Sequence, residues 1–470
     1  MGEHVQVGPS KSQRNTIRVL HVKAKSMPEL NGYSIRGHEI IRAQLKSGDV
    51  YPTCITSPFY PSIKTMQIDS EIEGVRYRRS LPFDESKISA SRRNFLRREL
   101  VGSRFGSTSA NSEFIRSFIR IATYPARMFL AIVGERIRSR YFQKCIEEEI
   151  SETGADIVHA HTPYKVGIPA LRAARKKGKK FVYEVRGIWE ESAIARGKFS
   201  KWGARYWRFR FGENRVIRSA DRIFCINELI KDDLISRGVN RDLITVILNG
   251  ARESMLSEGH QNQSGEIGEG EKILLESIKK TRAGAKIVGY IGSVQRYEGL
   301  DLLANAVKKI IDQGVDAHLL LISNTGIEED LRRYLRTIGM EEYSTFCGPI
   351  SREVIPRFYR EIDVIVIPRV GNSRMAELVT PLKPLEPIAL GVPLIVSDAP
   401  AMMEVVSHDT ATIFESGNVN DLVDKIRYIL LNQENAIEKS EKGKKWLAEN
   451  ATWEILARKT IVEYRNLLDY

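Results

Sequence analysis

Lys286-Ile-Val-Gly-Tyr-Ile-Gly-Ser-Val-Gln-Arg-Tyr-Glu-Gly-Leu300 joins an apolar run to a glycine turn and then to the start of a helical pattern. Similar short apolar runs recur along the chain, and helical stretches separate most of them. This alternation is typical of parallel strands that helices bury on both faces of a sheet. The sequence therefore predicts an α/β fold with doubly wound sheets.

The strand-like runs fall into two groups. The first group covers residues 17–23, 51–56, 156–161, 180–185, 221–226 and 243–248. The second group covers residues 286–291, 317–322, 345–347, 363–368 and 392–397. A chain of 470 residues is too long for one compact core, and two domains of roughly 200 residues each agree with usual domain sizes. Each group is therefore expected to form one Rossmann-like domain.

Composition sets the expected domain boundaries. The predicted segments are a disordered tail (1–16), an N-terminal Rossmann-like domain (17–252), a polar linker (253–275), a C-terminal Rossmann-like domain (276–440) and C-terminal helices (441–470). The C-terminal helices are expected to pack back toward the N-terminal domain. Residues 81–142 are rich in Arg and break the alternation, so they are expected to form a basic helical insertion in the N-terminal domain.

Positive charge is concentrated in two stretches. The chain has 72 Lys and Arg against 59 Asp and Glu, a net charge of +13. Residues 76–144 contain 16 basic and 5 acidic residues, and residues 196–222 contain 9 and 2. Such stretches attract the phosphates of nucleic acids, anionic lipids or activated sugars. They carry no recognisable nucleic-acid recognition motif, so no nucleic-acid partner is expected.

The sequence predicts a cytoplasmic protein, either free or peripheral at the inner face of the cell membrane. The polar stretch Met1–Ser10 lacks the apolar segment of a secretory signal. The longest apolar run, Met128–Val133, is far shorter than the roughly 20 residues that span a bilayer. Phe114-Ile-Arg-Ser-Phe-Ile-Arg-Ile121 has apolar and Arg residues at helical spacing. This stripe fits an anionic membrane surface and equally a face that packs on the N-terminal sheet.

The residues that commonly bind metals do not predict a metal site. Buried, inert thiols are expected at Cys54, Cys145, Cys225 and Cys347, which are far apart and form no Cys-x-x-Cys pair. His159 and His161 share one face of a predicted strand, but zinc needs three or four ligands and the sequence shows no third. No metal or other cofactor is therefore expected. His161 is expected to face a cleft and to contact a sugar or a phosphate.

Glycine and arginine residues at predicted strand ends are candidates for anion binding. Gly292 lets the backbone approach an anion, the amide of Ser293 can help to hold it, and Arg296 can supply charge. A glycine here serves equally well as a structural turn. Arg186 and Arg369 also end predicted strands, and a guanidinium fork suits phosphate or carboxylate.

Glu377-Leu-Val-Thr-Pro-Leu-Lys-Pro-Leu-Glu386 carries two carboxylates and a lysine after the strand at 363–368. Glu386 is expected in the first turn of a short helix that ends at Gly391, where the helix dipole favours a carboxylate. Glu386 either caps this helix or accepts hydrogen bonds from ribose hydroxyls, as acids do in dinucleotide folds. In the second case, Lys383 would reach the diphosphate.

In their order, these motifs resemble the family 4 retaining glycosyltransferases, which have the GT-B architecture of two facing Rossmann-like domains. The resemblance covers nearly the whole chain and rests on Asn31-Gly32, Asp156–His161, Asn249-Gly250, Gly289–Gly299 and Asp363–Pro393. A closer resemblance, to the glycosyltransferases of exosortase and exopolysaccharide loci, rests on Gly32–Arg36, Tyr183–Arg186, Tyr297–Asp301 and Glu377–Glu386.

The resemblance implies a metal-independent, retaining transferase of the hexosyltransferase type. Its co-substrate would be a nucleotide diphospho-sugar, and its acceptor a glycan or lipid-linked molecule in polysaccharide biosynthesis. The N-terminal domain would bind the acceptor and the C-terminal domain the donor. His161 and Glu377 would act on the donor sugar, Gly32 would approach the diphosphate, and Glu386 would hold the ribose. The remaining donor-binding residues would be Arg186, Gly292, Ser293, Arg296, Arg369, Lys383 and Leu385.

The chain departs from the family pattern in spacing. Glu377 and Glu386 are separated by eight residues instead of seven, so either one residue bulges or Glu377 is not the functional equivalent. The segment Asp398–Glu404 lacks the glycines of the family. Donor binding is thus expected to be altered or, at the extreme, lost.

The chain also departs from the family in charge. The phosphate-binding Arg and Lys of the family fall on Ser293 and Glu298. Arg296 and Lys383 are expected to compensate. The lost charges leave open a non-catalytic nucleotide-sugar-binding protein, and a nucleotide-sugar epimerase is a further alternative because the same architecture serves that class.

Overall fold

The computed structural model describes most of the chain. The described residues are 16–59, 69–80, 124–195, 197, 200–201, 203–257, 267–323, 329–371 and 373–469, with the backbone alone for 124–131. They group by contact into two compact units. The first unit falls within 1–29, 49–184 and 212–221, and the second within 30–48, 185–211 and 222–470. This grouping differs from the domain boundaries expected at 252 and 276, which stay a prediction.

One β-sheet has eight strands in the order β3-β4-β2-β1-β5-β6-β7-β8. These strands are β1 (Ile17–Lys23), β2 (Val50–Thr56), β3 (Asp69–Ile72), β4 (Val75–Arg79), β5 (Ile157–His161), β6 (Lys180–Val185), β7 (Arg222–Cys225) and β8 (Ile244–Val246). β5 pairs in parallel with both β1 and β6, whereas β3 and β4 are antiparallel. The first group of predicted strands is confirmed, while β3 and β4 were not predicted.

The other sheet has six strands in the order β11-β10-β9-β12-β13-β14, and all its pairings are parallel. These strands are β9 (Lys286–Ile291), β10 (Ala317–Ile322), β11 (Ser344–Cys347), β12 (Val364–Ile367), β13 (Leu394–Ser397) and β14 (Thr412–Phe414). The second group of predicted strands is confirmed, and β14 is an addition.

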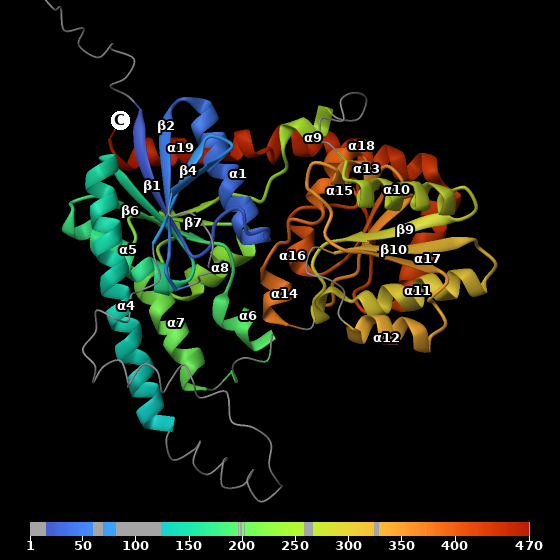
Figure 1. The fold of residues 1–470 in the computed structure, drawn as a ribbon, viewed down its shortest axis with the longest axis horizontal. Coiled ribbons are helices and arrows are strands. Elements are labelled where there is room, and N and C mark those ends of the chain that lie inside the picture. Colours follow the sequence, from blue (N-terminus) through green and yellow to red (C-terminus); the bar gives the residue numbers. More distant parts are fainter. Residues whose placement is uncertain are drawn as a thin grey trace, which may run out of the picture. The chain divides into compact units, whose positions relative to one another are not determined.

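Helices connect most of the strands (Figure 1). They are α1 (Gly32–Ser47), α4 (Tyr124–Thr153), α5 (Tyr164–Lys176), α6 (Trp189–Ala195), α7 (Ala204–Ile217), α8 (Glu228–Ser236), α9 (Glu253–Ser257), α10 (Glu269–Arg282), α11 (Leu300–Asp312), α12 (Glu329–Thr337), α13 (Ile355–Tyr359), α14 (Arg374–Leu378), α15 (Leu385–Leu390), α16 (Pro400–Met403), α17 (Val419–Leu431), α18 (Gln433–Asn450) and α19 (Trp453–Leu467). Asn31 caps α1 by accepting a hydrogen bond from the amide of Ser34 (2.9 Å). α15 ends at Gly391, whose φ of +70° favours glycine.

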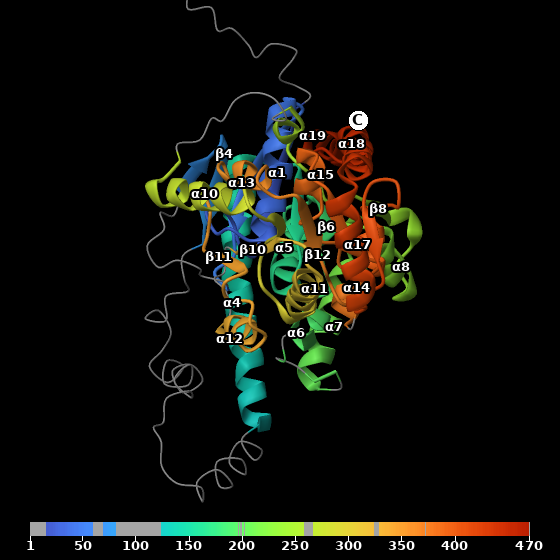
Figure 2. The ribbon, with the colours of Figure 1, turned by 90° about the vertical axis from the view of Figure 1, so that its right-hand side faces the viewer.

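Both faces of the six-stranded sheet are buried, as expected for a doubly wound sheet. Because successive side chains of a strand point to opposite faces, Ile287 and Val288 belong to different cores. Ile287 packs in a core with residues of α13, α15 and α18. Val288 packs in a core with residues of α11, α12 and α17. Figures 1 and 2 show these two sets of helices on either side of the strands.

Part of the expected linker at 253–275 is helical, which corrects the prediction of a loop there. It contains α9 and the first half of α10. Glu271 accepts a hydrogen bond from the amide of Gly268 (3.2 Å), and Leu275 and Ile278 are buried. The polar composition suggested a loop, but two buried side chains and a capped first turn stabilise this helix.

Of the expected insertion at 81–142, residues 124–142 belong to α4, and residues 81–123 lie outside the described part of the chain. The tail at 1–15 and the stripe at 114–121 also lie outside it. α19 packs on α1, where Gln44 donates to Thr460 (2.8 Å). Within the described residues, no helix is long and apolar enough to cross a membrane.

Candidate functional site

Three charged side chains form a buried cluster in the second unit, here called the Glu298 cluster: Glu298, Arg369 and Lys383. Nζ of Lys383 lies 2.7 Å from Oε1 of Glu298, and Nη2 of Arg369 lies 3.1 Å from the same oxygen. The side chains of Glu298 and Arg369 are 1% and 5% exposed, whereas that of Lys383 is 15% exposed. The cluster therefore holds two cations and one carboxylate, and Lys383 is its most accessible member.

Lys383 packs against the turn that begins at Gly292 after β9, here called the β9 turn. Gly292 follows β9 with a φ of +151°, a value that L side chains rarely adopt. A Cβ added at Gly292 would overlap Cε of Lys383. Nζ of Lys383 also lies 5.6 Å from the ring centroid of Tyr290. The interpretation of Gly292 as a structural turn is therefore confirmed, and its anion-binding role stays a prediction.

Charge and burial act in opposite directions on the Glu298 cluster. Burial raises the pKa of Glu298, but the charges of Lys383 and Arg369 outweigh it, so the pKa lies below its usual value. Burial also lowers the pKa of Lys383, although Glu298 opposes this shift. Glu298 is thus held as a carboxylate between two cations.

Ser293 and Arg296 lie in the turn that leads to the Glu298 cluster. The carbonyl of Ser293 accepts a hydrogen bond from Tyr290 Oη (2.8 Å). Arg296 begins the short 3-10 helix η4 (Arg296–Glu298) and is exposed. Among the described residues it has no ion-pair partner. Arg296 is therefore available to an anion, as the expected compensation for the lost family charges requires.

Glu386 lies in the first turn of α15, as predicted, and is partly exposed. Tyr359 Oη donates to its Oε2 (3.2 Å). Burial raises the pKa of Glu386, while the charge of Arg352 and the Tyr359 hydrogen bond lower it. Glu386 also lines a small pocket with Ile35, Gly250, Ala251, Arg252, Met255, Arg352, Leu382 and Trp453. This carboxylate therefore faces a pocket that also contains two arginines.

A buried carboxylate that the sequence analysis missed holds those two arginines. Oε1 of Glu39, on α1, lies 2.7 Å from Arg252 and 2.5 Å from Arg352. Burial raises the pKa of Glu39, but the two arginines outweigh it and the pKa is lowered. Arg252 follows the Asn249-Gly250 turn, so its position was the one available signal. Glu39 lies in a helix and had none.

Gly32 begins α1, and Arg186 contacts the same end of this helix. A Cβ on Gly32 would be 3.6 Å from Leu382 Cδ1, next to Lys383. Nη1 of Arg186 donates to the carbonyl of Tyr33 (3.0 Å), and its guanidinium lies over the Tyr33 ring at 5.1 Å. Arg186 therefore stabilises the Gly32 turn in this structure. Its contact with a donor stays a prediction.

Glu377 and Leu385 differ in exposure. Glu377 lies on α14, partly exposed, with no side-chain partner among the described residues. Leu385 is 1% exposed in the core, and its amide donates to the carbonyl of Leu382 (3.1 Å). Arg369 is also held at its other nitrogen, which donates to the carbonyl of Val379 (2.8 Å). The role of Glu377 as first glutamate stays a prediction.

In the first unit, His161 belongs to a buried group with His21, His159 and Glu184. Its Nδ1 lies 2.8 Å from Oε2 of Glu184, and its Nε2 lies 3.1 Å from Nδ1 of His21. The side chain of His161 has no exposed surface, which corrects the expectation that it faces a cleft. The two ring nitrogens thus contact residues of β6 and β1, the strands on either side of β5. A direct role for His161 on a donor sugar stays a prediction.

The three histidines are the one group of described residues whose ligand atoms could share a metal ion, since these atoms all lie within 4.8 Å of one another. The sequence analysis found no third ligand because His21 lies far away in the chain. Strand register brings it beside His159. The short contacts to Glu184 and within the group also fit a hydrogen-bonded network, so this arrangement alone does not imply an ion.

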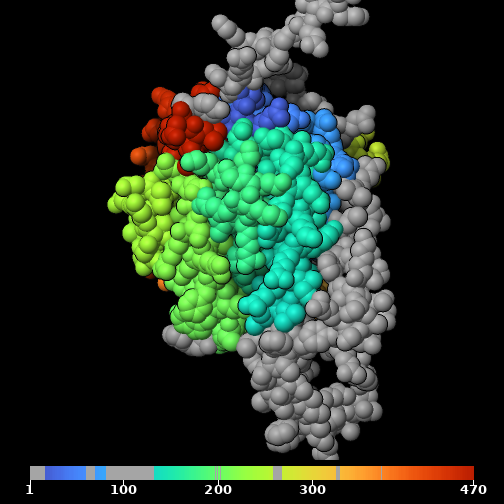
Figure 3. Space-filling view, turned by 90° about the vertical axis from the view of Figure 1, so that its left-hand side faces the viewer, coloured from blue at the N-terminus to red at the C-terminus, as the bar shows by residue number. Residues whose placement is uncertain are grey.

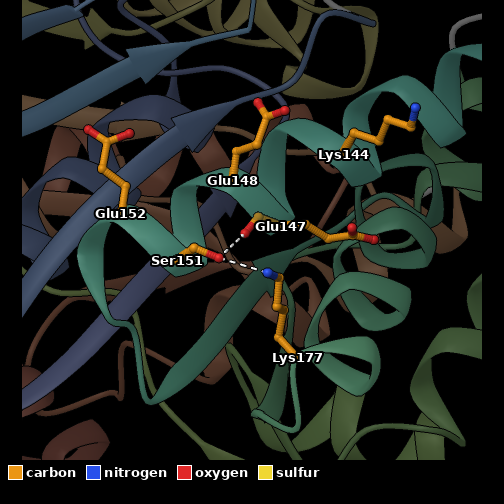
Figure 4. Close-up of a pocket in the computed structure, with 6 residues that line it drawn as sticks. All are labelled: Lys144, Glu147, Glu148, Ser151, Glu152 and Lys177. Atoms are coloured by element: carbon orange, nitrogen blue, oxygen red, sulfur yellow. Dashed lines mark hydrogen bonds between the residues drawn. The ribbon is translucent and has the colours of Figure 1, made fainter.

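A shallow hollow on the first unit is lined mainly by charged side chains (Figure 4). It is lined by Lys144, Glu147, Glu148, Ser151, Glu152 and Lys177. Ser151 Oγ donates to the carbonyl of Glu147 (3.0 Å) and accepts from Lys177 (2.7 Å). Acidic side chains outnumber basic ones here, so the hollow is unsuited to a diphosphate.

Two family profiles match the chain. The profile described as "Glycosyltransferase Family 4" matches residues 98–254, and the one described as "Glycosyl transferases group 1" matches residues 285–432. Each covers about a third of the chain, on either side of the predicted linker. The expected likeness to family 4 glycosyltransferases is therefore confirmed for both halves, whereas the exosortase subgroup stays a prediction.

Characterised relatives are distant. The capsular polysaccharide biosynthesis glycosyltransferase CapM of Staphylococcus aureus is 24% identical over 292 residues, which is 60% of this chain and 69% of that protein. A GDP-mannose-dependent phosphatidylinositol monomannoside mannosyltransferase of Mycobacterium tuberculosis is 25% identical over 164 residues, or 34% of this chain. The chain covers only 43% of the length of this mannosyltransferase.

Solved structures share the fold over nearly the whole chain. Sucrose-phosphate synthase of Thermosynechococcus elongatus has a TM-score of 0.67 at 15% identity, covering 97% of this chain and 99% of that one. Anabaena HepE in complex with UDP and glucose has a TM-score of 0.62 at 12% identity, covering 96% and 100%. With the two α/β sheets, these matches confirm the predicted GT-B architecture.

Proposed function

We propose that this protein is a glycosyltransferase that moves a sugar from a nucleotide diphospho-sugar to a glycan or lipid-linked acceptor. The observation that carries the proposal is the Glu298 cluster, which places Lys383 and Arg369 at the carboxyl ends of β9 and β12. Ligands of open α/β sheets bind at this edge. The two family profiles and the fold support the same class.

In the proposed donor site, Lys383, Arg369 and Arg296 neutralise the diphosphate. Catalysis then comes mainly from stabilising the negative charge of the departing nucleoside diphosphate. These cations belong to the protein, so the proposed reaction is metal-independent. Glu386, which lines the small pocket described above, accepts hydrogen bonds from the ribose.

The proposed sugar-binding residue is Glu377 on α14. Retention of the anomeric configuration and transfer of a hexose are parts of the proposal that follow from the family resemblance. The HepE structures contain UDP with glucose or UDP-glucose, and CapM is named for capsular polysaccharide biosynthesis. These names support a nucleotide-sugar donor and a role in polysaccharide assembly. The exosortase-associated subgroup is a part of the proposal that rests on the sequence resemblance alone.

We also propose that the protein contacts an anionic membrane surface from the cytoplasmic side. Four exposed arginines support it: Arg136 and Arg140 on α4, Arg172 on α5 and Arg215 on α7. Partial burial lowers the pKa of Arg172, and the charges of the other three lower it further, so the four lie near one another. None has an ion-pair partner among the described residues. Figure 3 views the face formed by α4 and α5.

The transfer proposal is tested by incubating the pure protein with UDP- and GDP-sugars and a glycan or lipid-linked acceptor fraction. Acceptor-dependent release of nucleoside diphosphate, with labelled sugar in a product of retained configuration, is the expected result. Conversion of the donor sugar without nucleotide release would instead identify an epimerase. Donor binding with neither reaction would identify a non-catalytic nucleotide-sugar-binding protein.

A further inference from the structure

We propose that Glu298 is an internal counter-ion that competes with the donor's diphosphate for Lys383 and Arg369 and so limits how tightly the nucleoside diphosphate is held. This inference rests on the proposed function, because it assigns a regulatory role within the proposed donor site. It concerns a residue that occupies the position of a phosphate-binding lysine in the resembling family.

The contacts show that Glu298 already occupies both cations. Lys383 and Arg369 bind the same oxygen, Oε1, at 2.7 and 3.1 Å. The other oxygen, Oε2, has no hydrogen-bond partner among the described residues. Two cations and one carboxylate leave the cluster with a formal charge of +1 in place of +2. A phosphate that approaches Lys383 therefore meets a cation that is already partly neutralised.

Accessibility decides where the competition takes place. The side chain of Lys383 is 15% exposed, while those of Arg369 and Glu298 are 5% and 1% exposed. Lys383 also passes directly over Gly292, in the turn proposed to bind the diphosphate. A diphosphate thus reaches Lys383 first, while the more deeply buried Glu298 attracts the same ammonium group. Arg369 is more deeply buried and is the second of the two cations to meet the diphosphate.

Removal of the carboxylate should reverse this balance. In Glu298→Gln, Lys383 and Arg369 become two neighbouring buried cations without a counter-ion, which destabilises the unliganded protein. A bound diphosphate restores the missing negative charge. Ligand binding should therefore become tighter, and the ligand should stabilise the variant more than the wild type.

The test measures binding of UDP and of GDP to the full chain by calorimetry, together with the ligand-induced change in Tm. Glu298→Gln should melt at a lower temperature without ligand. It should bind the preferred nucleoside diphosphate about tenfold more tightly, which corresponds to about 1.4 kcal/mol. Its Tm should rise more on ligand addition than that of the wild type. Glu298→Asp, which keeps the charge but withdraws the oxygens, should fold more readily and show a smaller gain.

Asp233→Asn is the matched control. Asp233 is likewise a buried carboxylate between two cations, with Arg237 at 2.6 Å and Arg374 at 2.5 Å. It should lower the Tm without tightening nucleotide binding. If the wild type binds a nucleoside diphosphate and both Glu298 variants bind it equally or more weakly, the role of Glu298 as a competing counter-ion is wrong. The proposed function would not be affected by that result. Failure of the wild type and all variants to bind any nucleoside diphosphate would overturn the proposed function as well.

Discussion

At the residue scale, the burial of Glu386 indicates a trade of stability for binding. Burial holds the pKa of Glu386 in the folded state above its usual value. Between the unfolded and folded pKa values the unfolded chain binds fewer protons, so the folded state loses stability as pH rises through this interval. The loss persists at neutral pH. An ionised carboxylate is thus maintained in the pocket against its burial.

Glu386→Gln should therefore increase stability at pH 7 relative to the wild type, while the two proteins should differ less near pH 4. The amide avoids the unfavourable ionisation but still accepts a hydrogen bond from Tyr359. Thermal or urea unfolding at the two pH values measures this difference. A Glu386→Gln protein that is less stable than the wild type at pH 7, and equally so at pH 4, would show that burial does not disfavour this carboxylate.

Residues were predictable from the sequence where a strand end or turn marked them, and their partners were not. Lys383, Glu386 and Gly292 lie where the motifs placed them. Glu39 and His21 were missed because helix packing and strand register bring them to their partners from distant parts of the chain. Likewise, the sequence showed that Glu298 stands where the family has a lysine, but its pairing with Lys383 became visible only in the structure.

At the scale of elements, the β9 turn depends on glycine for both conformation and space. Gly292→Ala should reduce the free energy of unfolding by about 1–3 kcal/mol, because it strains a backbone with positive φ. It should also weaken nucleotide binding, because the added methyl displaces Lys383. Denaturant unfolding and calorimetry check the two effects.

Gly270→Ala, in the first turn of α10, is the control for this substitution. Nothing lies within 4 Å of a Cβ added there. It should leave nucleotide binding unchanged and raise the free energy of unfolding by up to about 1 kcal/mol, since Ala favours helix. Equal effects of the two substitutions on binding would contradict the role assigned to the β9 turn.

The strands that the sequence analysis identified are those with continuous apolar runs, because both faces of a parallel sheet are buried. β3 was missed because none of its residues is buried and its pairing is antiparallel. β14 was missed because its apolar run ends at Phe414, before the polar Glu415 and Ser416. Few side chains at the start of α10 are apolar, so composition alone predicts a linker there. Apolar patterning therefore does not predict edge strands or polar helices.

At the scale of the whole molecule, the uneven charge should determine membrane binding. Replacing Arg136, Arg140, Arg172 and Arg215 with Ala should abolish most flotation with vesicles that contain anionic phospholipid at low salt, because each basic residue contributes about 1 kcal/mol near such a surface. Ala at four α18 lysines, Lys439, Lys442, Lys444 and Lys445, removes the same charge elsewhere. Equal loss in both variants would assign binding to net charge and not to the arginine patch.

The GT-B architecture and the likeness to glycosyltransferases follow from motif order, sheet topology and the family profiles together. The donor sugar, base and acceptor depend instead on pocket differences of only a few kcal/mol. No motif spacing encodes such differences. The sequence indicated the cations as candidate anion-binding residues, but it did not indicate which donor they would bind.

Turnover of Lys383→Ala shows whether Lys383 binds the diphosphate of a nucleotide-sugar donor, as we propose. With a donor that the wild type uses, kcat/KM should fall at least about 100-fold, since a charge that stabilises the leaving group is lost. Lys442→Ala, which removes a surface lysine paired with Glu438 at 2.8 Å, should retain wild-type turnover. Wild-type kcat/KM in a correctly folded Lys383→Ala protein would show that Lys383 does not bind the donor diphosphate.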